Sequence, residues 1–309
     1  GTVIGVDLNA SHLDQALQLK IIDQAMPMAE AINVSDLIVV AVPVNVIQHL
    51  LPQVLDLVTH QTVIDVGSTK EAILKTIEHH PNRKNFIATH PMAGTEFSGP
   101  EAAEADLFFG KTCVLIDIKD SDPAKVSQLE SLLTAIGVKL VYLDAKSHDV
   151  HVAYVSHISH ISSFALALTV LAKEKDENAI FELASGGFSS TVRLAKSNPD
   201  MWIPIFEQNK DNVLDVLDEH INTLSRFRSL LIKKEAIEAW EKYVFENEVP
   251  RLPANYIKSK LQIAKNQGNV EEELLWIGRL ISDRLALQNN EHIALATNLL
   301  NLLSKYGYE

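Results

Sequence analysis

Six consecutive apolar residues, Leu37 to Val42, most constrain what this 309-residue chain can fold into. A strand that is apolar on both faces belongs in a parallel sheet covered by helices, because neither face is left for solvent. Similar short runs recur along the first half of the chain, and helix-like segments separate them. Strands are predicted at 2–6, 37–42, 62–66, 85–89, 112–116 and 138–143. This alternation predicts a doubly wound α/β domain with a parallel sheet over residues 1–145.

After residue 145 the strands stop and only helical periodicity continues. Asp144 is a suitable N-cap for a long helix that we expect to end near Lys173. We therefore expect an all-α domain over residues 146–250 and a helical C-terminal extension of unknown role over 251–309. Further helices are predicted at 209–232, 235–245, 256–265, 271–287 and 291–303.

Composition argues against several classes of function. The 27 basic and 40 acidic residues give a net charge of −13, which disfavours binding to nucleic-acid phosphates. The single cysteine, Cys113, excludes an intrachain disulfide and suits a reducing compartment. No apolar run reaches the roughly 18 residues of a membrane span, and no signal peptide is recognised. We expect a cytoplasmic protein without nucleic-acid or membrane partners.

The chain opens inside a sheet, because the 2–6 strand leads directly into Asp7. In dinucleotide-binding folds an acid at the end of the second strand binds the adenosine ribose and favours NAD over NADP. Asp7 fits that position, or else it caps the helix that begins at Ala10. A glycine motif G-x-G-x-x-G should precede such an acid by about 20 residues, and the sequence has none there. We expect the first strand and glycine-rich loop to be missing, so that the chain as written binds NAD poorly.

His90 follows an apolar strand and begins the stretch H-P-M-A-G-T-E-F-S-G. Pro91 ends the strand, and Gly94 and Gly99 permit tight turns in the loop that follows. In open α/β sheets ligands bind at this carboxyl edge, and imidazole exchanges its proton most easily near neutral pH. The stretch is therefore either a proton-transfer site or an ordinary turn with a surface histidine.

The preceding strand ends in the sequence D-V-G-S-T-K, from Asp65 to Lys70. Gly67 permits a sharp turn, and a hydroxyl here would face the same crevice as His90. Alternatively, Ser68 or Thr69 only caps the following helix.

Four histidines fall on the long helix, and they form two pairs with i, i+3 spacing that can each share a helix face. They are His148, His151, His157 and His160. A metal site would need a carboxylate or thiolate in register, and Asp149 is expected to point elsewhere. Helix polarity, packing and substrate contact remain open for these rings.

A glycine pair, Gly186 and Gly187, precedes a predicted helix with Arg193 on an otherwise apolar face. An unpaired arginine is unfavourable to bury, and a carboxylate ligand would satisfy it with two parallel hydrogen bonds. A surface arginine paired with a nearby acid is the alternative.

Four motifs, in this order, resemble the prephenate dehydrogenase family of tyrosine biosynthesis, including its arogenate-using members. They are D-V-G-S-T-K from Asp65, H-P-M-A-G-T-E from His90, S-H-I-S-H from Ser156 and G-G-F-S-S-T-V-R-L-A-K-S-N-P-D-M-W from Gly186. The resemblance covers roughly residues 1 to 245. It implies a Rossmann-type domain, an all-α dimerisation domain, and NAD-dependent oxidative decarboxylation of prephenate to 4-hydroxyphenylpyruvate by a homodimer.

The resemblance also implies roles for single residues. By motif position, His90 looks like the base that accepts the proton of the substrate's ring hydroxyl, and Ser68 looks like the hydroxyl between that group and the nicotinamide. Arg193 looks like the arginine that binds the substrate carboxylate. The substrate pocket is expected to include His160, Thr95, Glu96, Gly186 and Trp202. The NAD contacts are expected at Asp7, Val42, Pro43 and Ser68, and no metal is expected.

The sequence departs from the family pattern after G-G-F, where Ser189 and Ser190 replace a common Arg-Asp and Val192 replaces a common Thr. The tail lacks the strand alternation of the regulatory ACT domain found in some relatives. Alternative functions are an arogenate dehydrogenase, a β-hydroxyacid-type dehydrogenase with a helix-borne lysine (Lys173 or Lys196), and a non-catalytic dimeric relative without a complete cofactor site.

Overall fold

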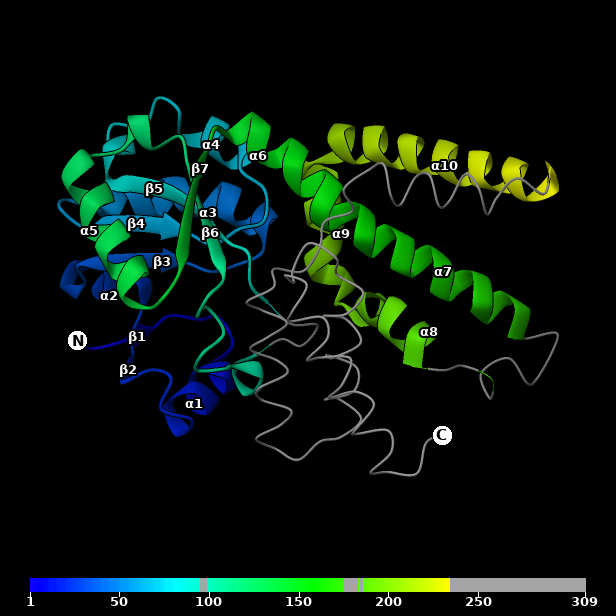
Figure 1. The fold of residues 1–309 in the computed structure, drawn as a ribbon. Coiled ribbons are helices and arrows are strands. Elements are labelled where there is room, and N and C mark those ends of the chain that lie inside the picture. Colours follow the sequence, from blue (N-terminus) through cyan, green and yellow to red (C-terminus); the bar gives the residue numbers. More distant parts are fainter. Residues whose placement is uncertain (95–98, 175–182, 184–185, 234–309) are drawn as a thin grey trace, which may run out of the picture. The chain divides into compact units, whose positions relative to one another are not determined.

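Strands and helices alternate along the first half of the chain, as the apolar pattern predicts (Figure 1). The computed structural model describes residues 1–94, 99–174, 183 and 186–233. Residues Gly1–Thr223 form one compact unit and Leu224–Glu309 a second. The described residues end at 233, so the helices predicted from residue 235 onward lie outside them.

A five-stranded sheet with the order β3-β4-β5-β6-β7 forms the centre of the α/β part. β3, β4 and β5 pair in parallel, as predicted, and so do β6 and β7. β6 runs antiparallel to β5, because the described part of their connection holds the 3₁₀ turn Pro100–Ala102 instead of a crossover helix. The strands are β3 Leu37–Val40, β4 Thr62–Asp65, β5 Phe86–Pro91, β6 Thr112–Ile116 and β7 Lys139–Leu143.

The first strand, β1 (Ile4–Gly5), pairs in parallel with β2 (Gln24–Ala25) and forms a sheet separate from the central one. Helix α1 (Ala10–Gln18) connects the two strands, close to its predicted position. β2 and the next helix, α2 (Met28–Val34), are not predicted by the sequence pattern. A two-residue strand is too short to show an alternation, and a seven-residue helix covers barely two turns.

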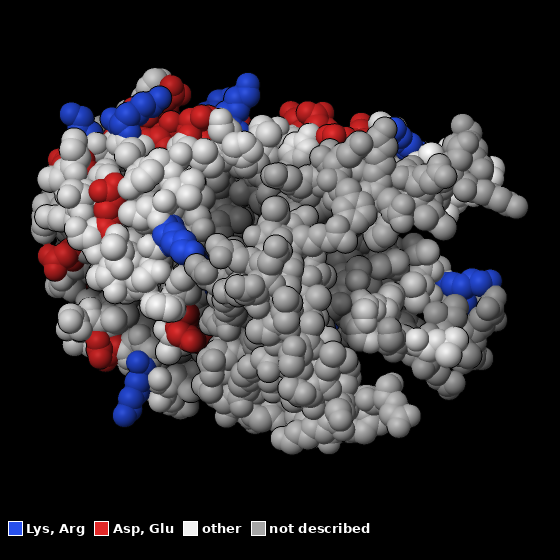
Figure 2. Space-filling view, in the orientation of Figure 1, with Lys and Arg blue, Asp and Glu red and all other residues white. Residues whose placement is uncertain are grey.

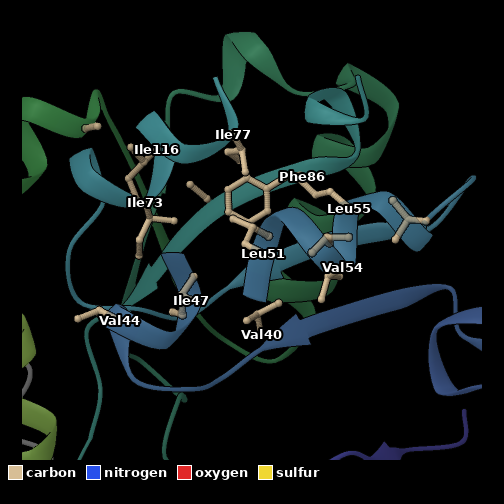
Figure 3. Close-up of a cluster of buried hydrophobic side chains, with 14 of the residues drawn as sticks. Val40, Val44, Ile47, Leu51, Val54, Leu55, Ile73, Ile77, Phe86 and Ile116 are labelled. Atoms are coloured by element: carbon tan, nitrogen blue, oxygen red, sulfur yellow. The ribbon is translucent and has the colours of Figure 1, made fainter. Parts of the chain in front are cut away.

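Helices cover both faces of the central sheet. α3 (Val44–Leu57) and α4 (Glu71–Ile77) pack on one face, where Figure 3 shows their apolar side chains gathered around Phe86. α5 (Pro123–Ala135) packs on the other face. The inner strands β4 and β5 are therefore buried on both sides, which explains their continuous apolar runs. The edge strand β3 is apolar on both faces as well, but its Val39 is 50% exposed, contrary to the expectation that neither face of that run is left for solvent.

One long helix leaves the α/β part, and Asp144 caps it as predicted by accepting a hydrogen bond from the Ser147 backbone. It consists of α6 (Ala145–Val152), a π turn (Ala153–His157) and α7 (Ile158–Glu174). Contrary to the expectation from composition, its stretch 145–173 is long and apolar enough to cross a membrane, judged by length and composition alone. Its first half carries buried polar side chains, which are described below.

The helices after residue 185 pack back onto this long helix and onto α3. The 3₁₀ turn Arg193–Lys196 lies against α7, and α9 (Pro199–Gln208) lies against α3. The glycine pair begins the short helix α8 (Gly186–Thr191) rather than preceding a helix. α10 (Lys210–Lys233) matches the helix predicted at 209–232.

The net negative charge is not gathered into one patch on the face that Figure 2 shows. Acidic and basic side chains of the described residues lie next to one another there, mainly along the upper edge. On this face the described residues form no continuous basic surface of the kind that binds phosphate backbones.

Candidate functional site

His90 lies near the end of β5, where pairing with Val114 of β6 fixes its backbone. Its side chain is buried, with 8% of its surface exposed, so the alternative of a surface histidine is wrong. The His90 Nδ1 atom lies 2.8 Å from Nε2 of His148, in hydrogen-bond contact, and the two rings meet edge to face. The strand end and the long helix therefore meet at two imidazoles.

Asp149 continues this contact on the far side of His148. Its Oδ1 atom lies 2.7 Å from His148 Nδ1, and both side chains are buried. The expectation that Asp149 points elsewhere is wrong. α6 packs against the start of α4, and there Asp149 contacts both His148 and the first backbone N–H groups of α4. His151 is exposed, so His148 and His151 do not share an environment despite their spacing.

The same carboxylate caps helix α4. The backbone N–H groups of Lys70 and Glu71 donate to Asp149 at 2.9 Å each. The expectation that Ser68 or Thr69 caps this helix is therefore wrong; the Thr69 hydroxyl instead donates to Gln208 of α9 at 2.6 Å. A cap supplied from a distant element ties the β4–α4 turn to the long helix.

A buried ion pair shapes the turn that carries Ser68. The Lys70 ammonium donates to Asp65 and to the Gly67 carbonyl, at 2.6 Å in each case, and the side chains of the ion pair are fully buried. Asp65 also accepts hydrogen bonds from the backbone N–H groups of Gly67 and Thr89, the second of which lies in β5. Because β4 pairs in parallel with β5, half-buried Ser68, which follows the end of β4, and His90, near the end of β5, lie at the same edge of the sheet.

The π turn continues the buried polar row along the long helix. It places His157 inside the molecule, where the Asn209 side-chain amide lies 3.2 Å from His157 Nδ1 and donates to the Asp149 carbonyl at 2.7 Å. Single π turns inside α-helices occur frequently at functional sites. Here the wider turn aligns His157 with the face that carries His148 and Asp149.

His160 and Trp202, two of the predicted pocket residues, lie in contact with each other. Their rings stack with a 3.5 Å centroid distance, and Trp202 also contacts His157 edge to face. The indole Nε1 of Trp202 is buried without a hydrogen-bond partner in the part of the chain that the structure describes. A buried donor of this kind usually has a partner, so it is suited to a ligand.

Arg193 begins the 3₁₀ turn that packs on α7 and is exposed, so the expected position on an apolar helix face is wrong. α8 ends at Thr191, and Arg193 lies in the separate 3₁₀ turn that follows. The residues around Arg193 therefore do not form one face of a continuous α-helix. The guanidinium is near enough to His160 to lower the pKa of that ring, although burial is the larger cause.

Burial decides the protonation of the central histidines. It lowers the pKa of His90 well below the ordinary value of 6.5, and the positive charge of Lys70 lowers it further. Burial likewise lowers the pKa of His157 to about 4. Both rings are therefore neutral at neutral pH, which leaves each with one nitrogen able to accept a proton.

The predicted cofactor contacts follow strands of two different sheets. Asp7 follows β1 of the two-stranded sheet, and Val42 and Pro43 follow β3 of the central sheet. Asp7 is exposed and accepts a hydrogen bond from the Asn9 backbone, whereas Asn9 itself caps α1. Pro43 is the exposed N-cap of α3, and Val42 is half-buried beside it. No hydrogen bond among the described residues links Asp7 to either of them.

The remaining predicted substrate contacts are Thr95, Glu96 and Gly186. Thr95 and Glu96 lie outside the described residues. Gly186 is exposed, and a Cβ atom added to it would meet no atom within 4 Å, so the backbone there does not require glycine for space. Within the described ranges, no group of three histidine, cysteine or acidic residues is placed to hold a metal ion.

Sequence reasoning missed Asp149, Lys70 and Asn209 as members of the site. One signal was present for Lys70, because a lysine five residues after a strand-end Asp can fold back on it across a glycine turn. Asp149 and Asn209 are recognisable only when distant segments are placed together.

The comparisons with known proteins cover most of the chain. Residues 1–142 match the nucleotide-binding domain of prephenate dehydrogenase, and residues 144–245 match its dimerization domain. A prephenate dehydrogenase of Bacillus subtilis is 30% identical over 238 residues, which are 76% of this chain and 64% of that protein. The match thus spans less than two thirds of that relative's length.

Two solved structures are similar as well. The prephenate dehydrogenase of Aquifex aeolicus in complex with hydroxyphenyl propionate and NAD⁺ has a TM-score of 0.73 and 28% identity, covering 80% of this chain and 88% of the other. The Synechocystis arogenate dehydrogenase has a TM-score of 0.62 and 27% identity, covering 79% and 89%. Since the two domains match in order and together cover residues 1–142 and 144–245, the chain belongs to the prephenate dehydrogenase family.

Proposed function

We propose that this chain is an NAD-dependent dehydrogenase that oxidatively decarboxylates prephenate to 4-hydroxyphenylpyruvate. The observation that carries the proposal is the buried, neutral imidazole of His90 at the carboxyl end of β5. The second imidazole, His148, holds its Nδ1 atom, so its other nitrogen is the one available for proton transfer. Ligands of doubly wound folds bind at this sheet edge.

The described residues fit part of an NAD site. The Asp7 carboxylate is exposed and suits the ribose hydroxyls of the cofactor, and Val42 and Pro43 precede α3 at a strand end. A glycine-rich turn for the pyrophosphate is not among the described residues, so we assign no contact to that group. NAD⁺ bound at this edge supplies an acceptor for the hydride that leaves the substrate ring.

In the proposed reaction His90 takes the proton of the ring hydroxyl while the ring loses its hydride to NAD⁺. The carboxylate then departs as CO₂, its electron pair aromatises the ring to a phenolate, and the proton returns from His90 to the phenolate oxygen. The products are 4-hydroxyphenylpyruvate, CO₂ and NADH, and aromatisation of the ring drives the reaction. The protein then needs only to orient the substrate and supply the base. Ser68 is proposed to bridge the reacting hydroxyl and the nicotinamide.

We propose that the substrate lies along the side chains of His160 and Trp202. The stacked rings offer an apolar wall, and the unpartnered Trp202 N–H offers a hydrogen-bond donor. Arg193, close to His160, is proposed to bind a substrate carboxylate, which would otherwise be repelled by the net charge of −13. Thr95, Glu96 and Gly186 remain proposed contacts on the basis of their motif positions alone.

Arogenate is the second candidate substrate, because the similar Synechocystis enzyme is an arogenate dehydrogenase. Arogenate carries an amino group where prephenate carries a keto group, and the reacting ring is the same. The two candidates therefore place the same demand on His90 and differ only at the side chain of the substrate.

The experiment is to mix the purified chain with NAD⁺ and either prephenate or arogenate and to follow the absorbance of NADH. We expect turnover with prephenate and less with arogenate; the reverse order would reassign the substrate. The absence of NADH with both substrates, at saturating cofactor, would refute the proposed activity.

A further inference from the structure

The Nδ1 atom of His90 begins a row of hydrogen-bonded, buried side chains that consists of His90, His148 and Asp149. His90 Nδ1 contacts His148 Nε2 at 2.8 Å, and His148 Nδ1 contacts Asp149 Oδ1 at 2.7 Å. Their exposed fractions are 8%, 0% and 2%, so solvent does not compete for these bonds. In an imidazole with one proton, one nitrogen donates a hydrogen bond and the other accepts one. The direction of each hydrogen bond in the row therefore follows from whether Asp149, the last residue, donates or accepts.

The carboxylate of Asp149 acts as an acceptor of hydrogen bonds in this structure. Its two oxygens already receive the Lys70 and Glu71 backbone N–H groups at the positive end of α4. The short contact to His148 therefore has its proton on the histidine. A His148 ring with one proton carries it on Nδ1, toward Asp149, and its Nε2 atom is then an acceptor toward His90.

The direction propagates to the base. Since His148 Nε2 accepts, His90 donates from Nδ1, and its Nε2 atom carries the lone pair. We propose that His148 and Asp149 are positioning residues that hold His90 in the Nδ1–H tautomer, with Nε2 free to take a proton. The inference rests on the proposed function for its catalytic consequence, but the tautomer itself is a property of the protein alone.

The Lys70 ammonium is close enough to act on His90 electrostatically, yet its donated bonds go to Asp65 and the Gly67 carbonyl. Asn209 holds the Asp149 backbone carbonyl and leaves its carboxylate to His148 and the helix terminus. The carboxylate thus fixes the ring of the base and, through α4, the turn that carries Ser68.

The test is nitrogen-15 NMR of the full chain with selectively labelled histidine, in the absence of substrate. Comparison with His90→Asn assigns the His90 signals among the twelve histidines. We expect the wild-type ring to carry its proton on Nδ1. A proton on Nε2 would overturn the proposal, and this arm requires no variant of the row to fold.

A second arm reverses the row with Asp149→Asn. The Asn oxygen still caps α4, but its NH₂ group faces His148 Nδ1, so His148 becomes the donor to His90 and the His90 proton moves to Nε2. We expect turnover to fall about 10²–10⁴-fold, the worth of a positioned base, with KM nearly unchanged. An unchanged His90 tautomer in this variant would contradict the proposal.

The matched control is Asp122→Asn, because Asp122 caps α5 through two backbone N–H groups and contacts no histidine in the described structure. It should leave the His90 tautomer and turnover unchanged. A wild-type chain with the Nδ1–H tautomer but no NADH formation from prephenate or arogenate would refute the proposed function and leave the tautomer assignment standing.

Discussion

At the residue scale, His90 combines a lowered proton affinity with a fixed orientation. Burial and the Lys70 charge keep the ring neutral, and a ring held at one nitrogen presents the other to a substrate. A base that is neutral well below pH 6.5 remains competent in mildly acidic solution, so the acid limb of kcat/KM should lie below that pH.

His90→Asn removes the proton acceptor while keeping a polar side chain of similar size. We expect turnover to fall about 10²–10⁴-fold, with an unchanged circular dichroism spectrum. His151→Asn, at an exposed position of α6, is the matched control and should leave turnover unchanged. Near-normal turnover of His90→Asn would rule out the base assignment.

Arg193→Ala tests the proposed carboxylate contact. The contact exists both before and during the reaction, so its loss should raise KM much more than it lowers kcat. Loss of a charge-assisted hydrogen bond costs about 1.5–3 kcal/mol, which corresponds to a rise in KM of roughly 10- to 150-fold. Lys196→Ala, in the same 3₁₀ turn, is the control, and an unchanged KM for Arg193→Ala would make the residue structural.

His157 should make the stability of the fold depend on pH. Its pKa is lowered from 6.5 to about 4 by burial, so between these values the unfolded chain binds the proton more strongly. The free energy of unfolding is therefore unaffected by protonation of His157 above pH 6.5 and decreases as the pH falls toward 4. The decrease is about 2 kcal/mol at about pH 5 and about 3 kcal/mol once the pH is below both pKa values.

Urea unfolding at about pH 7.5 and about pH 5 measures this effect. His157→Gln should lower the stability at the higher pH and show a correspondingly smaller decrease on acidification. The exposed His151→Gln should decrease as the wild type does. An equal pH response in His157→Gln and the wild type would show that His157 does not make this contribution.

At the element scale, the β4–α4 turn depends on the Asp65–Lys70 pair. Lys70→Met leaves the Asp65 charge buried without its ammonium, and removal of one partner of a buried pair costs about 3–5 kcal/mol. Asp65→Asn together with Lys70→Met should cost less than the sum of the single changes, because no uncompensated charge remains. Urea unfolding of the three variants gives the coupling, and additive losses would exclude it.

Elements with a strong local pattern were predictable from the sequence. The strand predicted at 112–116 and the Asp144 cap agree with the structure, because periodicity and capping are local properties. β2 and α9 were not predicted. β2 is too short to form a pattern. α9 contains two prolines, Pro199 and Pro204, and a proline in a sequence usually indicates that a helix begins or ends nearby.

The site was predictable in its types of residue and not in its connections. His90, His160 and Trp202 stand in recognisable motifs, and the structure places the last two in contact. The contact of His148 with His90 joins segments 58 residues apart, and the bond from the start of α4 to Asp149 joins segments 78 residues apart. No local pattern contains such a contact, since it depends on how the long helix packs against the sheet.

At the scale of the whole molecule, apolar side chains remain exposed on the helices. On α7, Leu168 and Leu171 are 66% and 48% exposed at i, i+3 spacing. On α10, Ile221, Leu224 and Leu231 form a similar row with about half of each surface exposed. Rows of this kind mark contact surfaces. Since residues 144–245 match a dimerization domain, we propose that a second copy of the chain covers them.

Sedimentation velocity at micromolar concentration should therefore give the mass of a dimer. Leu224→Glu places a charge in the α10 row, where burial against a second copy would be costly, and it should shift the mass toward the monomer without loss of helix content. Leu132→Glu, at an exposed position of α5 on the α/β part, should leave the dimer intact. A wild-type monomer would refute the dimer. A wild-type chain that instead floats with lipid vesicles would show that the apolar stretch 145–173 contacts membrane, because a face buried between two copies is not available to lipid.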